Sequence, residues 1–200
     1  MEILLQQIAD FFLSLGYLGI FIMMTLEASF IPFPSELALL PAGYLIGQGE
    51  MNTFIVLIVG TMGCIVGSSI NYFLGAFFGR ELILKHGKYL FLNNEKFKKM
   101  ENLFKKKGDF IVFFGRFIPV IRQYISFPPG IVKMNYFKFI TYTGIASGIY
   151  VSILVFIGYY CQGHKELINN LMGRFKILIL IIVILAGIYF IIKKGLRNET

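Results

Sequence analysis

Residues 27–49 form the most informative stretch of the sequence, EASFIPFPSELALLPAGYLIGQG. The stretch is apolar, yet three prolines, Pro32, Pro34 and Pro41, fall within ten positions. A proline inside a helix removes a backbone hydrogen bond and clashes with the preceding turn, which argues against one continuous helix. Broken backbone at membrane depth is tolerated only where it is buried in protein or lines a cavity. The pattern therefore predicts a re-entrant hairpin over residues 27–49, with two half-helices that meet near Pro34 and Ser35.

The composition around this stretch is that of an integral membrane protein. Of 200 residues, 56% are hydrophobic and only 15% are charged, and the mean hydropathy is +0.72. Soluble domains carry about 25% charged residues and disordered chains have low hydrophobicity, so neither class fits. Residues 51–79 and 139–163 contain no charged side chain. About 18 such residues are enough to propose a membrane-spanning helix. We therefore predict an all-α integral membrane protein.

A second proline-broken apolar stretch covers residues 110–130 and contains the sequence GRFIPVIR at residues 115–122. Phe-Ile-Pro at residues 30–32 recurs at 117–119, and Pro-Ala-Gly at residues 41–43 is echoed by Pro-Pro-Gly at 128–130. Both matches have an offset of 87 residues, which indicates an internal repeat with a second re-entrant hairpin. Paired broken segments in the two halves of a chain are the best sequence pointer to a transporter's binding site. The residues assigned to the two hairpins are Pro32, Pro34, Pro41, Gly43, Pro119, Pro128, Pro129 and Gly130.

The remaining segments complete a single membrane domain over residues 1–200. Apolar stretches predict transmembrane helices at residues 11–26, 51–79, 139–163 and 176–192. A basic segment at residues 80–107 and a basic tail at residues 193–200 complete the chain. Within the basic segment, Phe97, Met100 and Phe104 recur at helical spacing among lysines. This pattern is typical of an amphipathic helix on a membrane surface, and a solvated helix explains it equally well.

The net charge of +8 is concentrated in two places, because residues 80–107 carry +6 and residues 193–200 carry +2. Basic loops mark the cytoplasmic side, so both segments are expected in the cytoplasm, as parts of a multi-pass protein of the cell membrane. The two hairpins then open toward opposite sides and are inverted relative to each other. Membrane lipid, rather than nucleic acid, is the partner expected for these charges. Glycines four residues apart, such as Gly63 and Gly67, let helices approach closely and permit a homodimer.

Four charged residues lie in the hairpin regions, Glu27 and Glu36 in the first, Arg116 and Arg122 in the second. A charge in the middle of a membrane costs about 3 kcal/mol on insertion scales, so such residues face the protein interior or a water-filled cavity. If the hairpin tips meet, the four groups form one compact polar site. Because a guanidinium matches phosphate or carboxylate, Arg116 and Arg122 are expected to bind a substrate phosphate. Because a carboxylate in a cavity can exchange a proton or bind sodium, Glu27 and Glu36 are expected to couple or gate transport.

Other interpretations of these residues stay open. The four charges can be structural ion pairs that hold the hairpins together, and the basic helix can recruit partners in a scaffold protein. Glu27 can instead lie at a helix end near the membrane interface. Ser68 and Asn71, inside the span at residues 51–79, are explained by helix packing and helix–helix hydrogen bonds.

The sequence offers little for catalysis. The two histidines, His86 and His164, lie in polar loops outside the hairpins, and the two cysteines, Cys64 and Cys161, lie in apolar stretches. The sequence contains no serine–histidine pairing, no phosphate-cradling glycine loop and no metal-ligand spacing. We therefore expect no enzymatic activity, no metal and no cofactor.

Two motifs resemble those of the DedA family, also called the SNARE-associated or VTT-domain family. Glu27 followed by PFPSE at residues 32–36 is similar to the acidic, proline-rich first motif of that family. The sequence GRFIPVIR at residues 115–122 is similar to its second motif, which Gly130, Met134 and Phe137 continue with the usual spacing. Ser35 departs from the pattern, because many members have glycine before the acid.

The resemblance extends over most of the chain, from about residue 15 to residue 163, and implies two opposed re-entrant hairpins and a role in lipid translocation. Bacterial members are linked to recycling of undecaprenyl phosphate, and others to proton-motive force, alkaline tolerance and resistance to cationic peptides. By this resemblance the family's acidic positions fall on Glu27 and Glu36, and its arginines on Arg116 and Arg122. We therefore expect a flippase for a polyprenyl phosphate, coupled to protons or sodium. The alternative is a proton- or sodium-coupled ion transporter that supports membrane potential and pH homeostasis.

Overall fold

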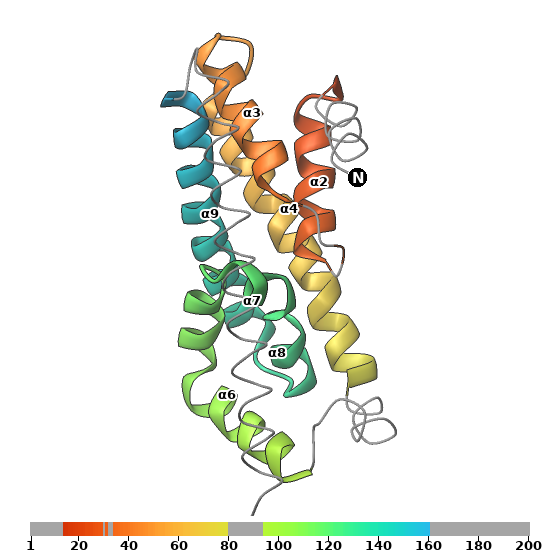
Figure 1. Ribbon diagram of the computed structural model, residues 1–200. Helices are drawn as coiled ribbons and strands as arrows, with labels where there is room; N and C mark the ends of the chain where they lie inside the picture. Colours follow the sequence, from red (N-terminus) through yellow and green to blue (C-terminus); the bar gives the residue numbers. More distant parts are fainter. Residues whose placement is uncertain (1–13, 30, 32–33, 80–93, 161–200) are drawn as a thin grey trace, which may run out of the picture. The chain divides into compact units, whose positions relative to one another are not determined.

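The computed structural model describes residues 14–29, 31, 34–79 and 94–160, which form helices and turns with no strand among them (Figure 1). The helices are α2 (Tyr17–Ala28), α3 (Glu36–Gly47), α4 (Thr53–Leu74), the π-helix η1 (Gly75–Gly79), α6 (Asn94–Gly115), α7 (Pro119–Tyr124), α8 (Phe127–Ile131) and α9 (Tyr136–Tyr160). The predicted all-α class is confirmed for this part of the chain. The following predicted features lie outside the described residues: positions 11–13, Pro32, positions 80–93 and 161–163, the helix at 176–192 and the tail at 193–200.

Two of the described helices are long and apolar enough to cross a membrane, Thr53–Gly79 and Tyr136–Tyr160. The first consists of α4 and η1, and its 27 residues correspond to about 40 Å, against about 30 Å for the hydrocarbon core of a bilayer. Both expose large apolar side chains, among them Phe54, Ile58 and Phe156. These helices correspond to the spans predicted at residues 51–79 and 139–163.

Asparagine side chains set the starts of both long helices. Asn52 accepts hydrogen bonds from two backbone N–H groups in the first turn of α4, at 2.9 and 3.3 Å. Asn135 Oδ1 accepts from the Lys138 N–H at 3.1 Å. Such caps satisfy N–H groups that have no partner within the helix. For this reason α9 begins at Tyr136, three residues before the start predicted from the apolar run.

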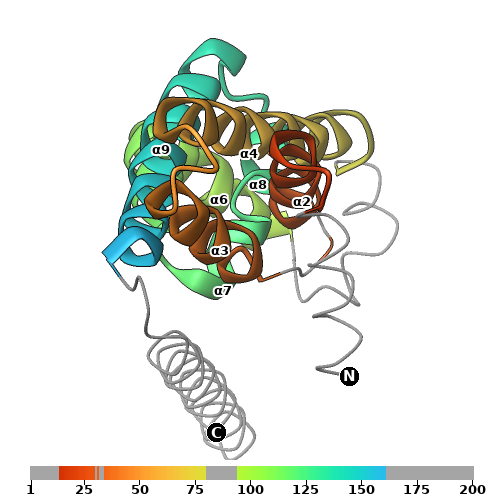
Figure 2. The ribbon, with the colours of Figure 1, turned by 90° about the horizontal axis from the view of Figure 1, so that it is seen from above.

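The first proline-rich region forms two short helices separated by a break. α2 and α3 have 12 residues each, or about 18 Å of helix, which is less than a membrane span. Because α2 continues to Ala28, the predicted boundary between a span ending at residue 26 and a hairpin starting at Glu27 falls inside a helix. Pro41 lies within α3 rather than at a bend. Both helices lie along the same half of α4 in Figure 1, and Figure 2 shows α2 beside α4 and α3 beside α9.

The second proline-rich region is built from the end of α6 and two very short helices. α6 is kinked at Lys107 (φ −135°, ψ 20°) and ends at Gly115. α7 has six residues and begins at Pro119, and α8 has five residues and carries Pro128 in its first turn. Proline is favoured there, because the N–H group that it lacks would have no helical partner. These prolines therefore start helices rather than interrupt them. In Figure 1 this region lies along the other half of α4.

Glycines bring the short helices into close contact with the long ones. A Cβ atom on Gly43 would overlap the backbone of α9, and one on Gly130 would overlap the backbone of α4 at Tyr72. Gly63 and Gly67 of α4 make a similar close approach to the backbone of α2. The glycine faces on which the expectation of a homodimer rested are thus occupied within a single chain.

The predicted amphipathic helix corresponds to the first part of α6, which begins at Asn94. Phe104 is only 7% exposed and packs in a cluster with Tyr72, Val112 and Phe139. At this position the apolar side of the helix covers the protein core. The packing of this cluster holds α6 against α4 and α9.

Candidate functional site

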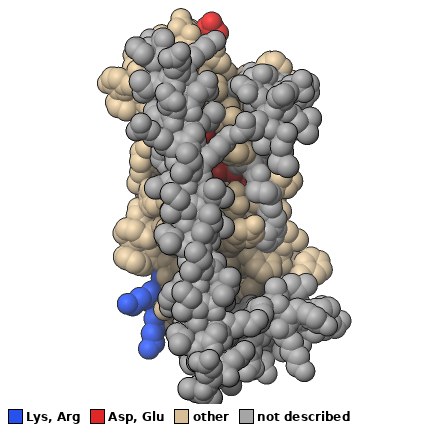
Figure 3. Space-filling view, in the orientation of Figure 1, with Lys and Arg blue, Asp and Glu red and all other residues tan. Residues whose placement is uncertain are grey.

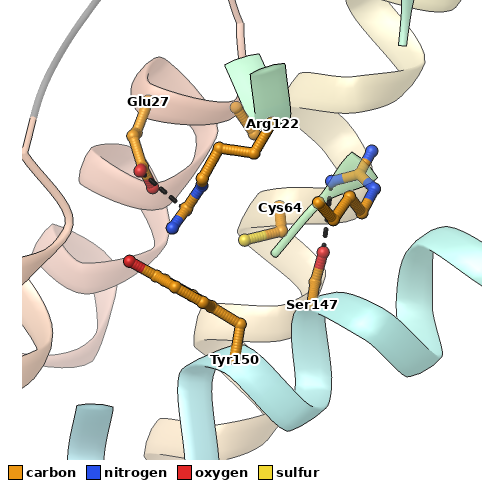
Figure 4. A pocket seen from close by; sticks show the side chains of 7 residues that line it. Glu27, Cys64, Arg122, Ser147 and Tyr150 are labelled. Carbon is orange, nitrogen blue, oxygen red and sulfur yellow. Dashed lines mark hydrogen bonds and ion pairs between the residues drawn. The ribbon is translucent and has the colours of Figure 1, made fainter. Parts of the chain in front are cut away.

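Two opposite charges from different halves of the chain form an ion pair in the interior. Arg122 Nη2 lies 2.6 Å from Glu27 Oε1, and the two side chains are 11% and 4% exposed. Glu27 belongs to the last turn of α2 and Arg122 to the last turn of α7, so the pair joins the ends of two short helices (Figure 4). The second carboxylate oxygen, Glu27 Oε2, is buried and has no hydrogen-bond partner within the described ranges of the chain.

Tyr150 of α9 connects this ion pair to a second carboxylate. The guanidinium carbon of Arg122 lies 3.8 Å from the centre of the Tyr150 ring, which is a cation–π geometry. The Tyr150 hydroxyl donates to Glu36 Oε1 at 3.4 Å and lies 3.3 Å from Ser35 Oγ. Arg122 Nη1 also donates to Ser35 Oγ, at 3.4 Å. Glu36 is therefore linked to Arg122 through Tyr150 and Ser35.

Arg116 is held by neutral hydroxyl groups. Its Nη2 donates to Ser68 Oγ at 2.7 Å and to Ser126 Oγ at 2.8 Å, and its Nη1 donates to Ser147 Oγ at 3.2 Å. Arg116 is 5% exposed, and its Nε has no hydrogen-bond partner in the part of the chain that the structure describes. Hydroxyl oxygens solvate a guanidinium without neutralising it, whereas an anion forms the stronger, charge-assisted bonds. Among the residues that the structure describes, no carboxylate contacts the positive charge of Arg116 directly.

Both arginines line one small cavity (Figure 4). The residues around it are Glu27, Ala28, Cys64, Arg116, Arg122, Ser147 and Tyr150. The volume of the cavity is about 10 Å³, close to the space that one water molecule requires. A phosphate group is larger than this. A phosphate therefore fits between these side chains only if the helix ends around the cavity move apart.

Asn71 of α4 holds together the two backbone segments that carry the ion pair. Its Nδ2 donates to the carbonyl oxygen of Ala28 at 3.0 Å and to that of Gln123 at 3.1 Å. Ala28 directly follows Glu27, and Gln123 directly follows Arg122. Asn71 is fully buried, so these bonds are not exchanged for water. A single amide group thus positions both partners of the ion pair.

The family model of the VTT domain matches residues 33–160 of the sequence, a range that contains α3, both arginines and α9. The chain belongs to the VTT-domain family. The resemblance inferred from the acidic and arginine motifs is therefore confirmed.

Relatives of this VTT-domain protein match it over nearly its whole length. The uncharacterized membrane protein YkoX of Bacillus subtilis is 34% identical over 199 residues, which cover 100% of this chain and 88% of that protein. Undecaprenyl phosphate transporter A of Bacillus subtilis is 33% identical over 193 residues, 96% of this chain and 95% of that protein. An alkaline phosphatase-like protein of Lactococcus lactis subsp. lactis is 32% identical over 196 residues, 96% of this chain and 88% of that protein. No solved structure is significantly similar to the chain.

With two long apolar helices and relatives named as membrane protein and transporter, this VTT-domain chain is a membrane protein. Of its predicted site residues, the structure brings Glu27, Arg116 and Arg122 to one cavity and places Glu36 against Tyr150. Their roles toward a substrate stay a prediction. The predicted hairpin prolines and glycines that the structure describes shape the helices and do not line the cavity.

Tyr150, Ser126 and Ser147 were not predicted as site residues, and Ser68 and Asn71 were predicted only to serve helix packing. The hydrogen bonds of Ser68 and Asn71 between elements confirm that packing role and add the contact with Arg116. The available signal was the presence of hydroxyl and amide groups inside apolar stretches. That signal is weak, since such groups also bond to their own helix, as Ser152 Oγ does to the Gly148 carbonyl.

Proposed function

We propose that this VTT-domain protein is a transporter that moves the phosphate head of a polyprenyl phosphate across the membrane, and that undecaprenyl phosphate is its substrate. The observation that carries the proposal is the buried cavity where Arg116, Arg122 and Glu27 meet. Arginine is the side chain best suited to recognise phosphate, because its planar fork matches two phosphate oxygens. A relative that is 33% identical bears the name undecaprenyl phosphate transporter A. The prenyl tail would stay in the lipid while only the head crosses.

In the proposed cycle, Glu27 and the substrate phosphate compete for Arg122. Glu27 neutralises Arg122 in the closed state. A phosphate that enters between the separated helix ends replaces the carboxylate and also reaches Arg116, which the hydroxyl groups of three serines hold. An unpaired buried carboxylate is costly, so the released Glu27 takes up a proton or a sodium ion. Glu36 responds to the exchange through the Tyr150 hydroxyl.

We further infer that the two broken regions are inverted re-entrant hairpins, as the internal repeat predicts. Gly43 and Gly130 are 87 residues apart, and each presses on the long helix of the other half, α9 and α4 respectively. Reciprocal packing of this kind is expected when two halves are related by an approximate twofold axis. By the bias of lysine and arginine, the basic segment at residues 80–107 and the tail lie in the cytoplasm.

The test uses the purified full-length protein in liposomes that carry labelled undecaprenyl phosphate in one leaflet. The wild type is compared with the double variant Arg116→Ala/Arg122→Ala. Labelled undecaprenol, which has the same tail without the phosphate, serves as the substrate control. We expect the wild type to accelerate the transbilayer movement of the phosphate lipid only, and the variant to accelerate neither.

Three results contradict the proposal: full activity of the variant, equal movement of the alcohol, and no acceleration by wild-type protein that is folded. Folding is checked by circular dichroism and gel filtration of the same preparation. In the third case, proton and sodium flux in the same vesicles measures the alternative function, a coupled ion transporter.

A further inference from the structure

A second and larger cavity lies away from the arginine site, at the kink of α6. Its volume is about 460 Å³, which is within the range of about 300–1,000 Å³ that is typical of small-molecule sites. Its wall contains three lysines, Lys106, Lys107 and Lys138, together with Asp109, Phe104 and Phe110. The kink shapes this cavity, because the non-helical backbone of Lys107 changes the direction of α6 at that point.

Positive charge converges on this cavity from two helices. Lys106 and Lys107 belong to α6, Lys138 belongs to the first turn of α9, and all three are exposed. Asp109 is the one carboxylate of the wall, so the three lysines leave a net charge of +2 there. In the described part of the chain, no ion pair joins Asp109 to these lysines. A lysine in the first turn of a helix also opposes the helix dipole, so Lys138 adds to a positive potential that an anion would relieve.

The apolar wall of the cavity favours a lipid over a soluble anion. Phe110 lines the cavity and is 60% exposed, and its ring lies 4.2 Å from that of Phe114, which is 50% exposed one turn further along α6. Exposed aromatic rings next to lysine side chains are typical of the membrane–water interface. On the face that Figure 3 shows, the visible lysine and arginine side chains lie at the end of the molecule where α6 lies.

We propose that this cavity binds the phosphate headgroup of an anionic membrane lipid. The three lysines contact the phosphate, and the exposed rings of Phe110 and Phe114 contact the acyl chain. The lipid comes from the leaflet at the basic end of the molecule. This site is separate from the arginine cavity and does not depend on the proposed function, because the bound lipid need not be transported.

The experiment titrates purified full-length protein, in a zwitterionic detergent, with phosphatidylglycerol that carries a fluorescent acyl chain. The pocket variant is Lys106→Gln/Lys107→Gln/Lys138→Gln. For a matched comparison, Lys138→Gln removes one charge from the cavity wall, and the control variant Lys133→Gln removes one from an exposed lysine that does not line it. We expect the pocket variant to bind on the order of 100-fold more weakly at low salt. Each basic residue near an anionic lipid surface strengthens binding about fivefold, and this variant loses three of them. The control variant should bind like the wild type.

Equal binding by the wild type and the pocket variant overturns the proposal. A loss in Lys133→Gln equal to that in Lys138→Gln also overturns it, because the effect is then one of net charge. Inorganic phosphate is the competitor that distinguishes the source of the anion, and displacement of the lipid by millimolar phosphate would assign the cavity to a soluble anion instead. All substituted lysines of the pocket are exposed, so the variants are expected to elute and unfold like the wild type.

Discussion

The surroundings of Arg122 explain how a full charge is tolerated in the interior. Its guanidinium contacts Glu27 of α2, Ser35 before α3 and the ring of Tyr150 in α9. A buried ion pair is not in itself strong evidence for stability, but removing one partner alone costs about 3–5 kcal/mol. Arg122 is therefore a residue whose loss affects several elements at once, and functional tests on it require a stability control.

Replacing Asn71 by leucine should loosen the two backbone segments behind the ion pair. Asn71→Leu leaves the Ala28 and Gln123 carbonyls without this donor, at a cost of about 1–3 kcal/mol for each unsatisfied group. We expect a lower unfolding temperature and faster maleimide labelling of Cys64, measured in a Cys161→Ser background. Ser152→Ala is the control, since Ser152 bonds within its own helix. If Cys64 in Asn71→Leu is labelled at the wild-type rate, Asn71 does not position the two backbone segments.

Two substitutions of Tyr150 should distinguish the contribution of its ring from that of its hydroxyl group. Tyr150→Phe keeps a ring beneath Arg122 but cuts the bond to Glu36, whereas Tyr150→Leu removes both contacts. We expect Tyr150→Phe to stay within about 1.5 kcal/mol of wild-type stability but to transport more slowly. Tyr150→Leu should lose about 1–2 kcal/mol more. Measured unfolding and translocation rates check both variants, and undiminished translocation by Tyr150→Phe would separate Glu36 from the proposed cycle.

At the scale of helices, the prolines predict that the backbone breaks but not how. The break between α2 and α3 coincides with Pro32 and Pro34 in the sequence, whereas Pro41 lies inside α3. A helix with one missing hydrogen bond is retained when tertiary packing holds it, and Gly43 presses α3 onto α9 two residues further on. Pro119 and Pro128 begin helices, which the sequence pattern does not distinguish from interrupting them. Packing between distant segments decides these cases.

Gly130 should tolerate no side chain. In Gly130→Ala the new methyl group would overlap the backbone of α4 at Tyr72, and backbone cannot move cheaply. We expect a loss of about 3 kcal/mol in the free energy of unfolding. Gly148→Ala is the matched control, because a Cβ there would lie 3.7 Å from Thr61 Oγ1, an ordinary contact. Thermal unfolding of both variants tests this, and equal stabilities would contradict the close packing of α8 on α4.

At the scale of the whole molecule, the composition predicts the membrane class and the cost of buried charge predicts the site. Glu27, Arg116 and Arg122 could be assigned to one site because a charged side chain inside an apolar stretch is costly in a membrane and therefore faces the protein interior or a cavity. The structure places all three on one cavity. The serines around Arg116 could not be assigned, because a hydroxyl group in a helix is equally satisfied by its own backbone. The role of these serines depends on which helices pack around Arg116.

The sidedness of the chain should follow its charge. Glu50 and Lys107 are both exposed. Glu50 shortly precedes the first turn of α4, whereas Lys107 lines a cavity together with Lys138 of the first turn of α9. In a Cys161→Ser background, we expect a membrane-impermeant maleimide on intact cells to label Glu50→Cys and not Lys107→Cys. Lysis of the cells should expose Lys107→Cys and serves as the control for reactivity. Labelling of Lys107→Cys from outside would reverse the assigned orientation.

In the proposed cycle, Glu27 and Arg122 take part in transport and are more than a structural pair, because the substrate phosphate competes with Glu27 for Arg122. The most direct measurement is translocation of undecaprenyl phosphate by Glu27→Gln/Arg122→Gln, in which both charges are removed together. Removing both charges leaves no unpaired charge in the interior, so this variant should lose less stability than either single substitution, and its unfolding is measured beside its transport. We expect a folded protein that no longer accelerates translocation. A folded double variant that translocates at the wild-type rate would contradict this role in transport.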